Sequence, residues 1–266
     1  MKKVITSVQN PLIRNVLMLQ DKPRERRKQE LFVIEGIREI SLAIESGYEL
    51  TTLFHCPDIF PGDHLDRLFP DVQSPCEMIE ISYPVFSRLA YRQESGGLIA
   101  LARYRQQTLQ DLRLPENPLV LILESVEKPG NLGAILRTAD AAGVSAVVVC
   151  DPQTDLYNPN TIRASLGTIF TNQVSVAPSK ETIDWLRANR IFIYGASLNA
   201  EASYHQTKFS DRSAIVMGSE AFGLSGFWLD QADELIKIPM HGKVDSLNVS
   251  TSAAILIFEA IRQREC

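Results

Sequence analysis

The chain has 266 residues, 45% of them hydrophobic, and a net charge of −5, which suits one large domain or two smaller ones and argues only weakly against a nucleic-acid partner. No apolar run approaches the roughly 20 residues that span a bilayer, and a polar stretch follows Lys2 and Lys3, so the sequence indicates neither a membrane protein nor a secreted one. Four scattered cysteines without metal-ligand spacing argue against a metal site and a disulfide framework, and favour a cytoplasmic protein.

Residues 1–105 predict a small unit in which helices and strands alternate. Asn10 followed by Pro11 is typical of a helix start, because asparagine can cap the helix and proline fits its first position. Short apolar runs bounded by turn residues indicate strands further along. The expected strands are 31–36, 50–56, 77–82 and 97–103, and the expected helices are 11–20, 37–46, one within 57–75, and 84–91.

The first 28 residues are strongly basic, although the whole chain is acidic. They carry eight lysines and arginines against only Asp21 and Glu25, a local charge of +6. Such a patch binds phosphate even on an acidic protein, because charges are screened within about 10 Å at 0.1 M salt. On charge alone, an RNA contact and a solvated helix end are both open interpretations.

The pattern becomes more regular beyond a polar stretch at 106–118, which contains two prolines and reads as a linker. The continuous apolar run at 119–125 is typical of a strand buried on both faces of a parallel sheet. Strands alternating with helices then predict an α/β fold with a mostly parallel sheet. The further strands are expected at 144–150, 173–177, 191–197, 214–218 and 234–239, and the helices at 131–142, 162–166, 181–189 and 248–262.

Three loops in this half carry polar residues that an ordinary turn does not require. We call 127–139 the first loop, 216–225 the second and 238–250 the third. Each follows a predicted strand, and ligands in open α/β sheets bind at the carboxyl ends of the strands, so the loops are expected to converge. The polar residues are Asn131 and Arg137 in the first loop, Glu220 in the second, and Ser246, Asn248 and Ser250 in the third.

The loops exclude several common chemistries. Residues 130–133 match neither the glycine fingerprint of a nicotinamide enzyme nor a phosphate loop, and no nucleophile elbow occurs. His241 is the only histidine near the loops, and a lone loop histidine is more often solvated than catalytic. Arg137 is open to two interpretations: a surface arginine, or a cation on a packed helix that needs an anionic partner, either Glu220 or a substrate phosphate.

The segments 131–143, 215–225 and 238–255, in that order, resemble the motifs of the SpoU/TrmH class of RNA ribose 2′-O-methyltransferases in the SPOUT superfamily. The stretch 9–36 is similar to the RNA-binding domain often fused to this family, which favours the RNA interpretation of the basic segment. The resemblance therefore implies an RNA substrate-binding domain at 1–105, a linker at 106–118 and a methyltransferase domain at 119–266. It also implies a deep trefoil knot and a homodimer packed around the C-terminal helix, although core packing explains the apolar 252–261 equally well.

The resemblance also implies the roles of individual residues. S-adenosylmethionine would be held mainly by backbone groups of Gly218, Ile238 and Leu247, and further by Met240 and Ser197. The reaction would transfer its methyl group to a ribose 2′-hydroxyl. Arg137 would orient that hydroxyl and stabilise the developing oxyanion, or remove its proton. Asn131 and Asn248 would fix the loop geometry, and Glu220 would pair with Arg137 or with backbone amides. Ser246 and Ser250 would serve as hydrogen-bonding groups. His241, Lys243 and Asp245 occupy variable positions and are assigned no role beyond RNA contact.

The sequence indicates the reaction more clearly than the RNA on which it acts. The fused N-terminal domain resembles those of enzymes that modify ribosomal RNA, so rRNA is expected as the partner. A transfer-RNA methyltransferase and a non-catalytic RNA-binding protein of the same fold are the alternatives, and the intact Asn131, Arg137, Glu220 and Asn248 argue against the second.

Overall fold

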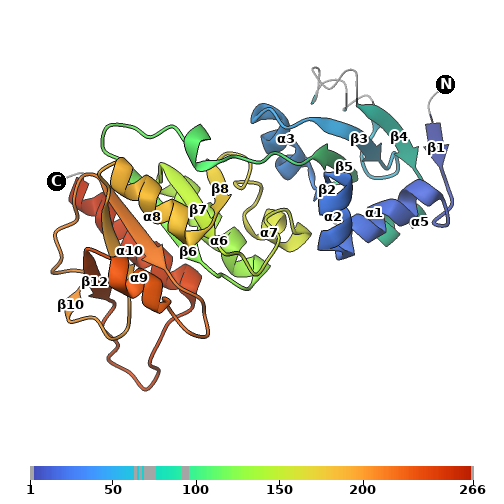
Figure 1. The fold of residues 1–266 in the computed structure, drawn as a ribbon. Coiled ribbons are helices and arrows are strands. Elements are labelled where there is room, and N and C mark those ends of the chain that lie inside the picture. The colour runs from blue at the N-terminus through green and yellow to red at the C-terminus, as the bar shows by residue number, and fades with distance from the viewer. Residues whose placement is uncertain (1–2, 63–64, 66–67, 69–75, 92–95, 265–266) are drawn as a thin grey trace. The chain divides into compact units, whose positions relative to one another are not determined.

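The chain forms two compact units in the computed structural model, which describes all residues except 1–2, 63–64, 66–67, 69–75, 92–95 and 265–266 (Figure 1). The N-terminal unit comprises 1–105 together with 155–171, and the C-terminal unit comprises 106–154 and 172–266. The sequence places 155–171 in the second domain, whereas the structure groups it with the first unit. Among the described residues, no helix combines the length and apolarity needed to cross a lipid bilayer.

The N-terminal unit is built on a mixed five-stranded sheet in the order β1-β4-β3-β5-β2. Pairings of β1 and β3 with β4 are parallel, and those of β5 with β3 and β2 are antiparallel. The strands are β1 Lys3–Ile5, β2 Leu31–Glu35, β3 Leu50–His55, β4 Glu77–Ile81 and β5 Leu98–Arg103, and the helices are α1 Pro11–Asp21, α2 Pro23–Gln29, α3 Ile37–Glu45, α5 Tyr83–Leu89 and α7 Pro159–Ala164.

The local sequence of α1 determines where this helix begins and which face it buries. The side chain of Asn10 accepts a hydrogen bond from the amide of Leu12 at 2.9 Å, which caps the helix start predicted from Asn-Pro. Ile13, Val16 and Leu19 are buried along one face and pack in one cluster with the strands and α5. The helix expected within 57–75 lies largely outside the described residues.

A buried ion pair ties the 155–171 segment to the rest of the N-terminal unit. Arg26 of α2 is fully buried, and its Nε donates to Asp155 Oδ2 at 2.6 Å. Its Nη1 donates to the carbonyls of Leu19 and Gln20. The hydroxyl of Tyr104 also donates to the Asp155 carboxylate. A carboxylate and two carbonyls thus accept from the guanidinium, and a buried arginine requires such acceptors because an unpaired charge is costly to bury.

Aromatic rings pack beside this ion pair. Phe32 of β2 stacks on Tyr157 with ring centroids 4.2 Å apart and an interplanar angle of 14°. Phe170 lies stacked against the same Phe32 ring, with a centroid separation of 6.1 Å. Tyr48 packs edge-on to both Phe32 and Phe170. Residues distant in the sequence therefore complete the core of the N-terminal unit.

The buried Arg26 corrects part of the sequence interpretation. It is one of the eight cations counted in the basic segment, but it holds Asp155 and cannot contact a solvent-borne phosphate. Lys2 lies outside the described residues, and Lys3 pairs with Glu77 at 2.9 Å. The exposed cations that remain on or beside the first two helices are Arg14, Lys22, Arg24, Arg27 and Lys28.

The C-terminal unit is a seven-stranded parallel sheet in the order β10-β12-β9-β11-β6-β7-β8. All six residues of β6 are buried, as the continuous apolar run predicts. The strands are β6 Leu119–Glu124, β7 Ala146–Cys150, β8 Val174–Ala177, β9 Phe192–Ala196, β10 Ala202–Ser203, β11 Ser213–Met217 and β12 Glu234–Lys237, and the helices are α6 Pro129–Ala141, α8 Ser179–Ala188, α9 Gly226–Gln231 and α10 Val249–Arg264.

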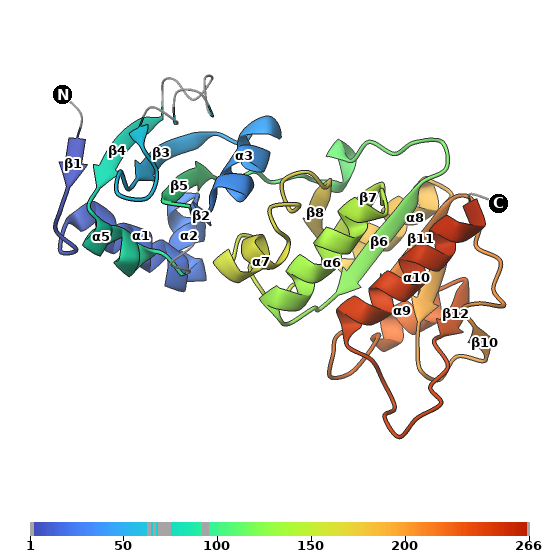
Figure 2. The ribbon, with the colours of Figure 1, turned by 180° about the vertical axis from the view of Figure 1, so that it is seen from behind.

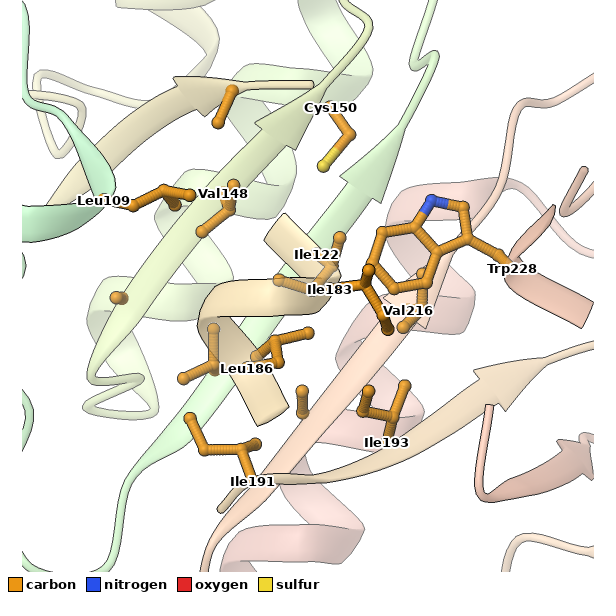
Figure 3. Packing of buried hydrophobic residues seen from close by; sticks show 14 of the residues in the cluster. Leu109, Ile122, Val148, Cys150, Ile183, Leu186, Ile191, Ile193, Val216 and Trp228 are labelled. Atoms are coloured by element: carbon orange, nitrogen blue, oxygen red, sulfur yellow. The ribbon is translucent and has the colours of Figure 1, made fainter. Parts of the chain in front are cut away.

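The predicted linker packs on the C-terminal unit. Thr108 and Asp111 form a reciprocal cap around a short 3-10 helix, η1, at Leu109–Asp111. Leu109 and Leu112 are buried in the same cluster as the strands and α8 and α9. Figure 3 shows this cluster, with Trp228 of α9 and Ile183 and Leu186 of α8 against the sheet. The cluster makes 106–118 part of a folded unit.

Helices cover both faces of the parallel sheet. Figures 1 and 2 show α8 and α9 on one face and α6 and α10 on the other. The adjacent strands β6 and β11 therefore lead into helices on opposite faces, α6 and α9. A seam of this kind opens a crevice at the carboxyl ends of the two strands, the usual ligand position in such sheets.

The Arg26–Asp155 pair yields a stability prediction. Replacing Asp155 with alanine leaves Arg26 buried without its anion, so unfolding of the N-terminal unit should become easier by about 3–5 kcal/mol. Urea titration of the full chain, followed by tyrosine circular dichroism, measures this. Glu49→Ala breaks the half-exposed pair with Arg103 and should cost about 1 kcal/mol or less. Equal effects of the two variants would contradict the proposed role of the buried pair.

Candidate active site

The second and third loops and the turn after β9 surround one cavity at the carboxyl ends of the strands. Its volume is about 610 Å³, within the usual range for small-molecule sites. The walls combine polar backbone with apolar side chains from several elements. The apolar contributors include Met217 of β11, Leu229 of α9, Ile236 of β12 and Leu256 of α10.

A chain of side-chain hydrogen bonds joins the three loops. Asn131 Nδ2 donates to Glu220 Oε1 at 2.6 Å, and Asn248 Nδ2 donates to Asn131 Oδ1 at 3.2 Å. The backbone amide of Glu127 donates to Glu220 Oε2 at 3.2 Å. The expected convergence of the loops is therefore observed, with Asn131 as the bridge between Glu220 and Asn248.

The side chain of Glu220 extends from the second loop to the start of α6, where its carboxylate accepts hydrogen bonds from backbone amides. Partial burial alone would raise the pKa of this carboxyl, but the hydrogen bonds from Asn131 and from the amides of Glu127 and Lys128 outweigh it and lower the pKa below its ordinary value. A carboxylate at a helix N-terminus is also favoured by the helix dipole. Glu220 is therefore an anion at neutral pH, and protonation in acid would remove this link.

Gly218 is required by the close approach of backbone within the second loop. A Cβ at this position would lie 2.1 Å from the carbonyl carbon of Gly223. The amides and carbonyls of Ser219 and Gly223 hydrogen-bond each other at 3.0 Å in both directions. Gly223 has a φ of +69°, a conformation that favours glycine. The two glycines together give the loop its narrow closed form.

Asn248 also defines the start of α10. Its Oδ1 accepts from the amide and the hydroxyl of Ser250, at 2.9 and 2.6 Å. The Ser250 hydroxyl is thus used within the cap. Ser246 is exposed, and its hydroxyl donates to Asp245 at 3.3 Å. The predicted polar residues of the third loop therefore separate into a structural cap and an exposed pair.

The predicted cofactor contacts all belong to one cavity. Ser197, Gly218, Ile238, Met240 and Leu247 all line the cavity. Three of the other predicted residues, Glu220, Ser246 and Asn248, line it as well. Asn131 is joined to the cavity through its hydrogen bonds to Glu220 and Asn248.

The structure contradicts one of the two interpretations of Arg137, that of a cation on a packed helix. Its side chain is exposed on α6, so it does not need a buried anionic partner. The contacts of Glu220 named above involve Asn131 and backbone amides, and in the part of the chain that the structure describes no ion pair joins Glu220 to Arg137. The arginine is therefore free to meet a ligand from solvent, as the surface interpretation allows.

Two residues of the site were not anticipated from the sequence. Glu124, at the end of β6, is buried, and its Oε2 accepts the amide of Ser225 at 2.8 Å, which fixes the end of the second loop. Lys128 lines the cavity beside Glu220. Their positions beside the first loop were visible in the sequence, but their contacts depend on the pairing of β6 with β11. Among the described residues no cluster of side chains suits a metal ion.

Comparisons with known proteins match both halves of the chain. The SpoU rRNA methylase family matches residues 118–258, and an MRM3-like substrate binding domain matches residues 10–100. The 23S rRNA (guanosine(2553)-2'-O)-methyltransferase RlmP of Bacillus subtilis is 30% identical over 256 residues, which are 96% of this chain and 98% of that protein. The chain belongs to the SpoU rRNA methylase family.

Solved structures agree along the whole length. The crystal structure of an RNA 2'-O ribose methyltransferase matches with a TM-score of 0.85 and 38% identity, covering 99% of this chain and 100% of the other. An AdoMet-bound rRNA methyltransferase from Sinorhizobium meliloti matches with a TM-score of 0.89 and 28% identity, covering 98% and 97%. The predicted SpoU membership and the mostly parallel α/β fold are confirmed, while the trefoil knot stays a prediction.

The close packing at Gly218 yields a prediction for this SpoU-family loop. Gly218→Ala should force Gly218 and Gly223 apart, destabilise the protein by about 1–3 kcal/mol, and speed hydrogen exchange at the amides of Ser219 and Gly223. Gly226→Ala, where a Cβ meets no atom within 4 Å, is the matched control and should leave both amides protected. Unchanged exchange in Gly218→Ala would show that the loop tolerates the methyl group.

Proposed function

We propose that this chain methylates the 2′-hydroxyl of a ribose in ribosomal RNA, with S-adenosylmethionine as the methyl donor. The observation that carries the proposal is the meeting of the second and third loops around one cavity, with the first loop bound to both through Asn131, in a chain of the SpoU family. The Sinorhizobium meliloti neighbour binds AdoMet, and the Bacillus subtilis relative is a 23S rRNA methyltransferase. A methyl-transfer assay with rRNA from a strain lacking the gene tests the proposal.

The cavity fits the donor in its chemistry. S-adenosylmethionine supplies, when bound, an electrophilic methyl group on a sulfonium. Gly218, Ile238 and Leu247 would hold it through backbone groups, with Met240 and Ser197 beside them. The apolar Leu229 and Ile236, which line the same cavity, suit an adenine ring. Glu220 and Asn248 keep the two loops in place around the donor.

The remaining task is to align a weakly acidic ribose hydroxyl and help it lose its proton. Glu220 is poorly suited as the base, because its lowered pKa makes it a weak proton acceptor. We assign to Arg137 the role of orienting the hydroxyl and stabilising the developing oxyanion, since a guanidinium stays charged and offers several donors. Asn131 acts by holding Glu220 and Asn248.

The N-terminal unit would supply RNA affinity. Arg24, Arg27 and Lys28 lie on α2 at helical spacing and are exposed, so they can share one face toward phosphates. The match of residues 10–100 to a substrate binding domain supports this role. The end-to-end likeness to a 23S rRNA enzyme favours ribosomal over transfer RNA. An rRNA substrate also supports a cytoplasmic setting, as do free Cys56 and Cys150.

A homodimer is part of the same proposal. Helix α10 buries Val249, Ala253 and Leu256 within its own unit, but Phe258 on the same helix is 49% exposed. An exposed phenylalanine on a helix whose other face is buried suits contact with a second copy. A monomeric mass by light scattering at micromolar concentration would contradict the dimer.

The role of Arg137 can be tested kinetically. Arg137→Ala should lower kcat by about 10²–10³ with RNA and donor saturating, the usual effect of losing one oxyanion donor, while donor affinity measured by calorimetry stays unchanged. Arg113→Ala is the control, because Arg113 is also exposed but precedes β6 at the amino end of the sheet. Wild-type turnover in Arg137→Ala would refute the assignment.

The basic face of α2 can be tested by salt dependence. Replacing Arg24, Arg27 and Lys28 together with glutamine should weaken rRNA binding and reduce the slope of log K against log salt by about 0.7–0.9 per lost phosphate contact. Filter binding at several salt concentrations measures the slope. The control replaces Lys3 and Arg103, which are already paired with carboxylates. A slope equal to that of the wild type would place the RNA elsewhere.

A further inference from the structure

The second loop holds one aromatic side chain in solvent beside the cavity. Phe222 is 90% exposed, more than any other large hydrophobic side chain in the described part of the chain. Tyr91, at 70%, has the guanidinium of Arg163 over its ring at 3.6 Å. Among the described residues, no ring or cation lies against Phe222 in this way. Fold stability does not explain the exposure, because burial of the ring would be favourable.

The loop presents this ring from a fixed backbone. On one side of Phe222, Glu220 is held by Asn131 and by the amide of Glu127. On the other, Gly223 is paired with Ser219, and the amide of Phe222 itself donates to Ser219 Oγ at 3.1 Å. A phenylalanine has only two side-chain torsions, so little conformational entropy is lost when a ligand covers it. The ring is thus a preorganised surface.

The surroundings of the ring suit a nucleotide. Phe222 lines the same cavity as the proposed donor contacts, and so does the exposed cation Lys128. The neighbours Ala221 and Gly223 are small, which leaves the ring accessible. Leu198 and Leu247, which are 57% and 38% exposed, are the other large exposed apolar side chains that line the cavity. A ring with a nearby cation offers stacking to a base and attraction to a phosphate.

The reaction itself creates a need for such a surface. Methylation of a 2′-hydroxyl does not change the base, but the ribose must lie at the donor, and a base held by the enzyme fixes the position of its ribose. RNA-binding proteins hold unstacked bases on aromatic side chains. We propose that Phe222 stacks on the base of the nucleotide whose ribose is methylated, and so positions the 2′-hydroxyl at the cavity. This inference rests on the proposed function.

The exposed ring fits a base better than a protein surface. The residues flanking it in the loop include Ser219, Glu220 and Ser225, and Leu198 and Leu247 belong to other segments, so within the second loop the ring is the one large exposed apolar surface. Stable protein interfaces need about 800 Å² on each partner. One base, by contrast, covers one ring. A second copy of the chain against Phe222 is the alternative outcome of the test.

The test compares substitutions at Phe222 in the full-length protein. The probe is 23S rRNA from a strain lacking the gene, with labelled S-adenosylmethionine. Phe222→Ala and Phe222→Leu should raise the KM for rRNA roughly 5- to 100-fold, which is the effect of losing one base–aromatic stack. Phe222→Trp, which keeps an aromatic ring, should have the KM of the wild type. Calorimetric affinity for S-adenosylmethionine and the mass by light scattering should not change. Phe192→Ala, on an aromatic that is 37% exposed at the amino end of β9, is the matched control.

Each outcome decides the proposal. An unchanged KM in Phe222→Ala, or wild-type behaviour of Phe222→Leu, overturns stacking. A loss of donor affinity in Phe222→Ala would assign the ring to the donor cavity, and a loss of dimer mass would assign it to contact with a second copy. Either result also overturns stacking. A short RNA that carries the mapped site can be made without the base on the target ribose. On this abasic RNA, the wild type and Phe222→Ala should have the same KM. A difference in KM that persists overturns contact with that base. Wild-type protein that transfers no methyl group to rRNA overturns the proposed function first.

Discussion

The carboxylate of Glu220 reaches across the seam between β6 and β11 and accepts donors from the loop on the other side. Through Asn131 it also connects to Asn248, where the third loop enters α10. Hydrogen bonds to a charged group contribute about 1.5–3 kcal/mol each, which is enough to hold short glycine-containing loops in one form. This arrangement joins the loops around the cavity to the start of α10.

The parallel sheet explains why the seam lies where it does. The adjacent strands β6 and β11 lead to helices on opposite faces, so their loops separate at the carboxyl edge. The cavity lies at this edge, at the ends of β9, β11 and β12. Backbone groups and apolar side chains line the cavity together with the charged residues Lys128, Glu220, Lys237 and Asp245. Arg137, on the exposed side of α6, then stands apart from the proposed donor contacts.

Much of this could be predicted from local sequence. The apolar run at 119–125 becomes the fully buried β6, and Asn10-Pro11 begins a helix, because both signals depend on adjacent residues. The two-residue β10 carries too little pattern to be recognised. Arg26 was counted with the exposed cations, since its partner Asp155 is 129 residues away. The bridging role of Asn131 likewise depends on two loops that meet only after the sheet has formed.

The grouping of 155–171 with the N-terminal unit has a consequence for how such proteins exchange modules. The chain passes between the units three times, at 105/106, 154/155 and 171/172. A recombination within 106–118 would carry Phe32 and Arg26 into a new protein but leave Tyr157 and Asp155 behind. The unit that is inherited as one stretch of sequence is thus smaller than the unit that folds around one core. Successful shuffling would have to transfer both pieces together.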